Sequence, residues 1–326
     1  MRSKNILICG HYEKNNLGHN LFLDAYNLLF PNYNLITTNF ITLENLLNID
    51  AVFFGGGSFL YAPPNVANNA FELLKTKKIF YIGVGVETDI HPLHQELIKI
   101  SQLIATRSYD YLAKAKELNE YAIWMPDLAY CLQSSVVNTK TKEKSVLILP
   151  NISIVPQWND PHWVHISWEF FKNEFAQFLD ILVSENYTIN FLAMCNNNKV
   201  NDDFAAAEII NSMSNRDKSY IIQSSKRDFE NITKLFSQSQ FVISQRFHGI
   251  VLSELTRTPY LAIHHHDKIK THYPQNGFYL PYYGINKDSL IVNFRMMHNY
   301  SPVLTIDTDI FRVLKEAICH MIDDII

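Results

Sequence analysis

The chain has 326 residues, of which 47% are apolar and 18% charged, and its formal net charge is -4. This length allows two globular domains, and the lack of a basic excess argues against a nucleic-acid partner. The four cysteines are far apart and form no CxxC pair, which argues against a disulfide framework or a structural zinc site.

The N-terminal half alternates short apolar runs with a helical pattern. The first run, residues 6–9, is too short for the core of a signal peptide, and no stretch is long enough to span a membrane. We therefore expect a cytoplasmic protein and leave peripheral contact with a membrane open. Strands are expected at residues 6–9, 51–54, 79–82 and 103–106, and a first helix at residues 20–29. Runs that are apolar at nearly every position indicate parallel strands covered on both faces.

The second half repeats this alternation after a polar segment, residues 134–144, which is the best linker candidate. Strands are expected at residues 146–149, 188–194, 220–222, 241–244 and 260–263, and helices at residues 170–183, 203–213, 228–237, 250–255 and 308–326. We therefore expect an α/β protein with two doubly wound, Rossmann-like domains, residues 1–140 and 145–305, facing each other across a cleft. Residues 306–326 are expected to form a helix that packs back on the N-terminal domain or on a partner subunit.

Residues 244–249, Ser-Gln-Arg-Phe-His-Gly, hold the sharpest group of functional side chains. They follow an expected strand and precede an expected helix, and such strand ends are where doubly wound sheets bind ligands. Arg246 offers a planar fork for a carboxylate or phosphate, and His248 can exchange a proton near neutral pH. If this loop is extended, both side chains face the same way, beside a helix N-terminus that favours an anion. This interpretation is favoured over a surface arginine beside a capping histidine.

Further motifs accompany this cluster in a fixed order. They are Asn16-Leu17-Gly18, Gly55-Gly56-Gly57, Thr106-Arg107-Ser108, Met125-Pro126-Asp127-Leu128-Ala129, Thr258-Pro259-Tyr260 and Asp267-Lys268. Together with Ser-x-Arg-x-His-Gly, they resemble the polysaccharide pyruvyl transferases from about residue 8 to residue 270. His19 and Ser108 stand where that family usually or often has Asp, and both departures bear on the acceptor or on the reaction.

The resemblance implies a GT-B-like fold and an enzyme that transfers pyruvate from phosphoenolpyruvate to a sugar, as a cyclic ketal on two hydroxyls. We expect His248 and Arg246 to be catalytic. The expected donor-binding residues are Arg107, Lys268, Ser244, Gly249, Gly56 and Gly57, and the expected acceptor-binding residues are Asn16, His19, Trp158 and Trp163. Phosphoenolpyruvate is a co-substrate in this scheme, a glycan or another sugar-containing molecule is the acceptor, and no cofactor or metal is required.

Three features allow two interpretations. The triple glycine either lets a strand turn sharply into a helix or lets the backbone approach a ligand. The aromatic residues between positions 156 and 171 either pack in the core or stack on sugar rings. His264-His265-His266 suggests a metal site, but neighbouring side chains on a strand end alternate in direction, so a loop near the donor is favoured.

Two rival functions remain. One is a GT-B glycosyltransferase that uses a nucleotide sugar, although no base pocket or ribose-binding carboxylate is evident in the sequence. The other is a non-catalytic protein that binds a glycan or an anion. The oligomeric state is left open.

Overall fold

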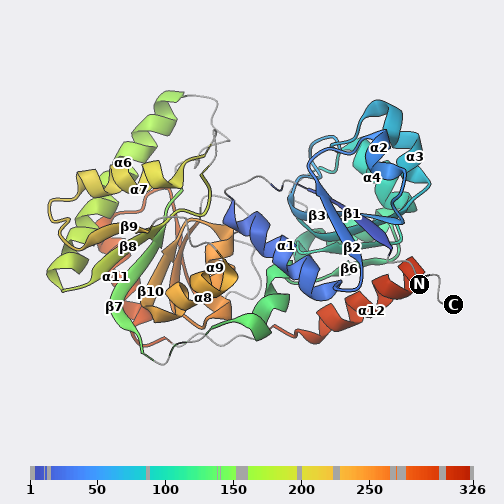
Figure 1. Ribbon diagram of the computed structural model, residues 1–326. Coiled ribbons are helices and arrows are strands. Elements are labelled where there is room, and N and C mark those ends of the chain that lie inside the picture. The colour runs from blue at the N-terminus through green and yellow to red at the C-terminus, as the bar shows by residue number, and fades with distance from the viewer. Residues whose placement is uncertain are drawn as a thin grey trace.

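The computed structural model describes residues 4–10, 12, 16–85, 89–137, 139, 141–151, 161–196, 200–222, 228–264, 269, 277–300 and 306–323, with only the helical backbone at 161–164. Over these residues the chain forms two parallel six-stranded sheets, each flanked by helices (Figure 1). The expected α/β class is therefore confirmed.

The N-terminal sheet has the strand order β2-β1-β3-β4-β5-β6. Its strands are β1 (Asn5–Cys9), β2 (Asn34–Thr38), β3 (Ala51–Ser58), β4 (Lys78–Gly85), β5 (Leu103–Thr106) and β6 (Ala122–Trp124). Its helices are α1 (Leu17–Leu29), α2 (Leu43–Leu46), α3 (Phe71–Lys75), α4 (Pro92–Ile100) and α5 (Leu112–Leu118), with short 3-10 helices η1 (Asn68–Ala70), η2 (Tyr109–Tyr111) and η3 (Leu128–Ser135). The four strands that the sequence predicts here are all present. The edge strands β2 and β6 were not predicted, because β2 is largely polar and β6 has only three residues.

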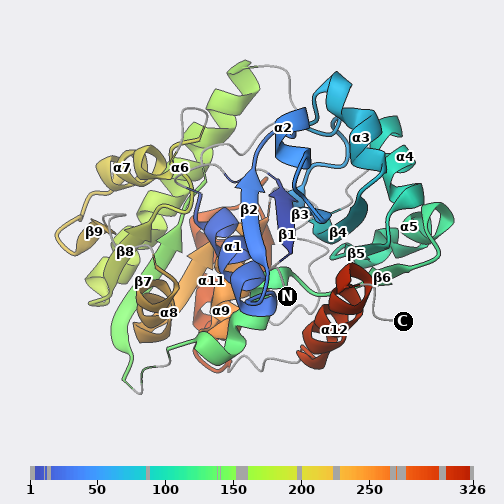
Figure 2. The ribbon, with the colours of Figure 1, turned by 45° about the vertical axis from the view of Figure 1, so that its right-hand side comes forward.

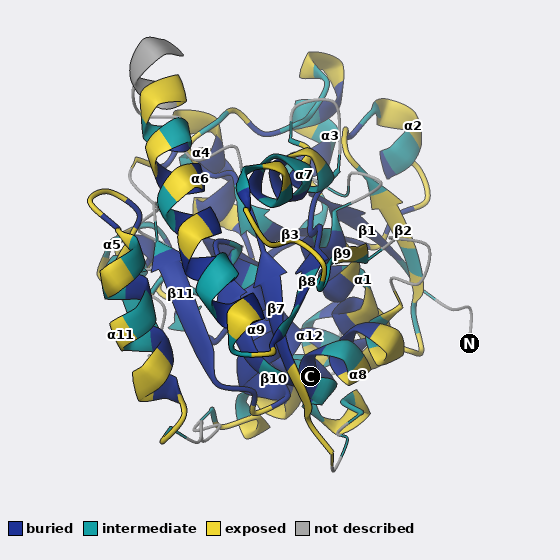
Figure 3. Cartoon of the chain, turned by 90° about the vertical axis from the view of Figure 1, so that its left-hand side faces the viewer, coloured by how far each residue is buried: buried dark blue, intermediate teal, exposed yellow. Residues whose placement is uncertain are grey.

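The C-terminal sheet has the strand order β12-β11-β10-β7-β8-β9. Its strands are β7 (Glu143–Leu149), β8 (Thr188–Leu192), β9 (Ser219–Ile222), β10 (Ser239–Ser244), β11 (Tyr260–His264) and β12 (Phe278–Pro281). Its helices are α6 (Pro161–Ser184), α7 (Asp202–Ser212), α8 (Phe229–Gln238), α9 (Phe247–Leu255) and α11 (Lys287–Met297). The central strands β7, β10 and β11 are buried beneath helices whose outer faces are exposed (Figure 3). Here β12 and α11 were not predicted.

The predicted boundaries that follow β3, β4 and β10 were wrong, and β4 runs past its expected end at residue 82 to Gly85. Strand β3 does not stop before the triple glycine but runs on to Ser58, because Gly57 and Ser58 still pair with β4. The positive φ angles of Gly56 (75°) and Gly57 (130°) show why glycine is needed there. Helix α9 begins at Phe247 rather than near residue 250, so His248 lies in a first helical turn and not in an extended loop.

The two domains share one hydrophobic core, to which α1, η3 and α9 all contribute. At the start of α1, the Leu17 amide donates a 2.8 Å hydrogen bond to the Met194 carbonyl just beyond β8. Helix α12 (Asp309–Asp323) returns to the N-terminal domain, as Figures 1 and 2 show, where Lys78 Nζ donates to the Met321 carbonyl at 2.6 Å. Among the described residues, no helix is long and apolar enough to cross a membrane.

Candidate active site

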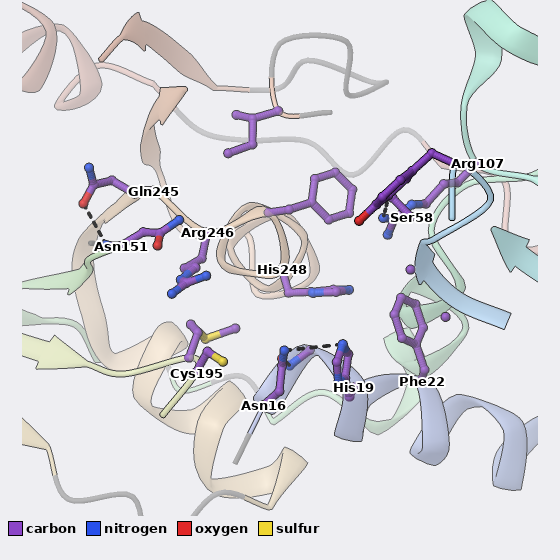
Figure 4. Close-up of a pocket in the computed structure, with 17 residues that line it drawn as sticks. Asn16, His19, Phe22, Ser58, Arg107, Asn151, Cys195, Gln245, Arg246 and His248 are labelled. Carbon is purple, nitrogen blue, oxygen red and sulfur yellow. Dashed lines mark hydrogen bonds between the residues drawn. The ribbon is translucent and has the colours of Figure 1, made fainter. Parts of the chain in front are cut away.

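A cavity of about 300 Å³ lies where the carboxyl ends of the two sheets face each other (Figure 4). Arg246 enters it from beyond β10 and Arg107 from beyond β5, so each domain contributes one guanidinium. Figure 4 shows these arginines on opposite sides of the cavity, with His248 between them. The convergence follows from topology, because all strands of a parallel sheet end at one edge.

Arg246 is held by a fully buried carboxylate. Its Nε donates to Asp202 Oδ2 at 3.0 Å and its Nη2 donates to Asp202 Oδ1. Burial raises the pKa of Asp202, and the charge of Arg246 and the backbone N–H groups of Cys195 and Met194 oppose this without cancelling it. No described residue accepts a hydrogen bond from Nη1 of Arg246.

The turn that presents Arg246 is built by its neighbours. Ser244 Oγ accepts from the Arg246 amide at 3.0 Å and donates to the Arg246 carbonyl at 2.8 Å. Gly249 packs so tightly beneath this turn that a Cβ on it would lie 2.3 Å from Ser244 Oγ. Ser244 and Gly249 are not among the described residues that line the cavity. They support the turn that presents Arg246, which does line it.

Arg107 is more enclosed than Arg246, with a side chain 8% exposed against 18%. Its Nη1 donates to Asp127 Oδ2 at 2.6 Å, and its Nη2 donates to Ser58 Oγ at 3.3 Å. The guanidinium carbon lies 4.7 Å from the centre of the Phe247 ring, which belongs to the other domain. Arg107 is thus fixed by its own domain on one side and by α9 on the other.

His248 also reaches across the domain boundary. Its Nδ1 would lie only 2.1 Å from a Cβ placed on Gly18, so only glycine at that position of α1 admits the imidazole. The Phe22 ring meets the imidazole edge to face, with centroids 5.0 Å apart. On the N-terminal side, Asp127 Oδ2 lies 3.8 Å from His248 Nε2.

Asp127 therefore has both a guanidinium and an imidazole beside the same carboxylate oxygen. Burial raises its pKa, but the charges of His248 and Arg107 and a hydrogen bond from the Ala129 amide outweigh burial, so the pKa of Asp127 lies below its ordinary value. The Ala129 bond, 3.0 Å to Oδ1, makes Asp127 the N-cap of η3 and fixes the orientation of the carboxylate.

Two more of the expected residues lie at the start of α1. Asn16 caps this helix by accepting from the Gly18 amide at 3.0 Å, and its Nδ2 lies 3.4 Å from Nε2 of His19. Both side chains line the cavity below His248 in Figure 4. Gly56 and Gly57 line it too, and a Cβ on Gly56 would lie 2.7 Å from the Phe22 ring. Close packing against α1 therefore also requires glycine at this position.

The structure brings together seven of the expected site residues. Those that line the cavity are Asn16, His19, Gly56, Gly57, Arg107, Arg246 and His248. Trp158 and Lys268, like His265 and His266, lie outside the described residues, and Trp163 lies where only the backbone is described. Among the described residues, no group of three or more His, Cys, Asp or Glu side chains is placed to hold a metal ion.

The sequence interpretation missed the two aspartates that hold the arginines. Asp127 was visible as part of the Met-Pro-Asp-Leu-Ala motif, but nothing in the sequence linked it to Arg107 or His248. Asp202 begins α7 and carries no motif signal, and its pairing with Arg246 depends on the path of the chain between β8 and α7.

These features define a two-domain α/β protein with a cavity between its domains that is lined by two arginines and two histidines. The family model of polysaccharide pyruvyl transferase matches residues 4–267, so the chain belongs to that family and is a transferase. No curated protein matches the chain in sequence.

Solved structures with the same fold are known. UDP-GlcNAc 2-epimerases from Methanocaldococcus jannaschii and from Neisseria meningitidis, the latter bound to UDP-GlcNAc, are each 12% identical to this chain. They give TM-scores of 0.58 and 0.57, with 97% and 98% of this chain and 100% of each epimerase covered. The S. aureus MnaA–UDP structure is also 12% identical, with a TM-score of 0.61, and covers 98% of this chain and 97% of its own. At these identities the likeness shows the fold alone, which is GT-B-like, as the sequence resemblance implied.

Proposed function

We propose that this protein transfers the pyruvyl group of phosphoenolpyruvate to a sugar, as a cyclic ketal on two hydroxyls. The observation that carries the proposal is that Arg107, Arg246 and His248 converge from two domains on one small cavity. Phosphoenolpyruvate presents a carboxylate and a phosphate on three carbons, so it suits two guanidinium groups that approach from opposite sides. The cavity volume of about 300 Å³ is at the small end for ligand sites, which favours this donor over a nucleotide sugar.

The side chains present supply the steps of such a transfer. A protonated His248 gives its proton to the donor methylene, which becomes the methyl group, and positive charge develops on the neighbouring carbon. A sugar hydroxyl attacks that carbon and returns its proton to His248. Phosphate then leaves with the two electrons of its C–O bond, while Arg246 and Arg107 stabilise its negative charge. The second hydroxyl closes the ketal, and its proton leaves with the phosphate.

Calorimetric titration with phosphoenolpyruvate tests this donor assignment. We expect the wild-type protein to bind phosphoenolpyruvate and Arg246→Lys to bind it at least about tenfold more weakly, because lysine keeps the charge but loses the planar fork. The matched control is Arg295→Ala, which removes a guanidinium whose side chain is 63% exposed and pairs with Glu185 on the surface.

The rival functions give different results in the same experiment. Binding of UDP-N-acetylglucosamine without binding of phosphoenolpyruvate would replace the proposal with a nucleotide-sugar transferase. Binding of phosphoenolpyruvate without phosphate release, across a panel of glycan acceptors, would instead favour a non-catalytic binding protein. Equal affinity in wild type and Arg246→Lys would remove Arg246 from the donor site.

A further inference from the structure

The imidazole of His248 is enclosed by the domain that does not carry it. His248 belongs to α9 of the C-terminal domain, yet Gly18 and Phe22 of α1 and Asp127 of η3 surround its ring. The carboxylate of Asp127 is 1% exposed and lies 3.8 Å from His248 Nε2, while the Nδ1 edge of the ring lies against Gly18. Placement and charge of this side chain thus depend on contacts across the domain boundary.

From this geometry we infer that Asp127 is the positioning residue of His248, which it holds in the charged state with a proton on Nε2. The inference rests on the proposed function only in that a charged His248 is the acid that protonates the donor. Asp127 itself does not touch the donor in this scheme, because it acts through the imidazole.

The charges around the imidazole support this assignment. Asp127 is the only carboxylate among the described residues placed to pair with His248, and its negative charge offsets the repulsion that Arg107 and Arg246 exert on a charged imidazole. Arg107 already occupies Oδ2 of Asp127 at 2.6 Å, so this carboxylate is shared between two cations. A charged His248 favours the ionised form of Asp127, and the coupling is reciprocal, so an ionised Asp127 favours the charged form of His248 by the same amount.

The fixed orientation of Asp127 makes it suited to this role. Its Oδ1 accepts from the Ala129 amide at 3.0 Å, which leaves Oδ2 directed toward Arg107 and His248. A carboxylate held in this way keeps an imidazole in one orientation and stabilises the imidazolium. The Asp-x-Ala motif of the sequence therefore has a physical explanation. Asp127 caps η3 by accepting from the Ala129 amide, and this bond directs its second oxygen toward His248.

Titration of His248 by NMR tests the inference without any substrate. The histidines are labelled with ¹³C at Cε1, and the His248 signal is identified by its loss in His248→Asn. In Asp127→Asn we expect the titration midpoint of His248 to fall by about one pH unit or more, because a carboxylate within ion-pair distance is removed. The matched control is Asp202→Asn, which neutralises the other buried aspartate of the cavity and should move this midpoint by much less.

Phosphoenolpyruvate binding separates this inference from the proposed function. At a pH below the His248 midpoint of both proteins, we expect Asp127→Asn to bind phosphoenolpyruvate as tightly as wild type or more tightly, because His248 keeps its charge and the variant removes a negative charge beside the cavity. An unchanged His248 midpoint in Asp127→Asn would overturn the role of Asp127 even if phosphoenolpyruvate binds. Conversely, a shifted midpoint in a protein that does not bind phosphoenolpyruvate would contradict the donor assignment and leave the Asp127–His248 pairing standing.

Gly18→Ala separates the position of His248 from its charge. The new Cβ would lie 2.1 Å from Nδ1, so the imidazole must move while every charge is kept. We expect at least about a tenfold loss of phosphate release with an accepted glycan, since a displacement of about 1 Å can reduce a rate strongly. The control is Asn20→Ala on the exposed side of the same helix, and equal activity of both variants would contradict the enclosed placement of His248.

Discussion

Two arginines line the cavity, one from each domain, and each is paired with a buried aspartate, but the two pairs have different surroundings. Asp202 is fully buried and gives both of its oxygens to Arg246. Asp127 gives one oxygen to Arg107 and also faces His248, and Arg107 is stacked on Phe247 of the other domain. The Arg246 pair is thus local to the C-terminal domain, whereas the Arg107 pair depends on contacts that cross between the domains.

The largest expected difference between the two pairs is the stability cost of losing the arginine. Arg246→Ala leaves the carboxylate of Asp202 buried without a counter-charge, and we expect it to lower the free energy of unfolding by about 3–5 kcal/mol. Arg107→Ala should cost less, about 1–3 kcal/mol, because Asp127 retains His248 at 3.8 Å and the Ala129 amide. Urea denaturation of both variants measures the difference.

A double variant shows whether the Arg246 effect arises from the pair. Adding Asp202→Asn to Arg246→Ala removes the uncompensated charge, so the double variant should be more stable than Arg246→Ala alone. A cost for Arg107→Ala equal to or above that of Arg246→Ala would contradict the view that Asp127 has a second cationic partner.

The two aspartates should also differ in how they make stability depend on pH. The pKa of Asp127 is lowered in the folded state, so its contribution is present above the ordinary value of 3.8 and is lost as pH falls through the folded pKa. The pKa of Asp202 is raised, so the unfolded chain releases this proton first, and stability is lost as pH rises above 3.8.

Difference curves isolate these opposite slopes. The free energy of unfolding of wild type minus that of Asp127→Asn should rise with pH at the acid end, whereas the difference from Asp202→Asn should fall as pH increases. Denaturation is measured both below and above pH 3.8, because the Asp127 slope lies below that value and the Asp202 slope lies above it. Difference curves whose slopes have the same sign would show that the pKa values of Asp127 and Asp202 are shifted in the same direction.

The fold was largely predictable from the sequence because most of its strands are buried on both faces. Strands such as β1 and β11 are apolar at nearly every position, and this pattern does not depend on distant contacts. The missed strand β2 lies at the edge of its sheet, where none of its side chains is fully buried. Its pairing with β1 comes from the sheet already formed and not from its own composition.

For the candidate site, the sequence predicted only which residues lie at the carboxyl ends of the strands. Arg107 and Arg246 each follow a buried strand, so their meeting at the cavity follows from topology. The pairing of these arginines with aspartates, and the placement of His248 against Gly18, depend on side-chain directions and on how the domains pack. Those contacts join residues far apart in the chain, and no local pattern in the sequence encodes them.

The smallest expected effect concerns the stacking of Arg107 on Phe247, the contact that makes the Arg107 pair depend on both domains. Phe247→Leu keeps an apolar side chain but removes the ring beneath the guanidinium, and a cation–π contact of this kind is worth about 0.5–2 kcal/mol. We expect a coupling energy of that size in a double-mutant cycle of Phe247→Leu with Arg107→Ala, measured by denaturation. Phe247→Tyr keeps the ring and serves as the control. Coupling near zero would mean that Asp127 and Ser58, and not Phe247, hold Arg107. Both arginine pairs would then be local to their own domains, and His248 would still be positioned from across the boundary.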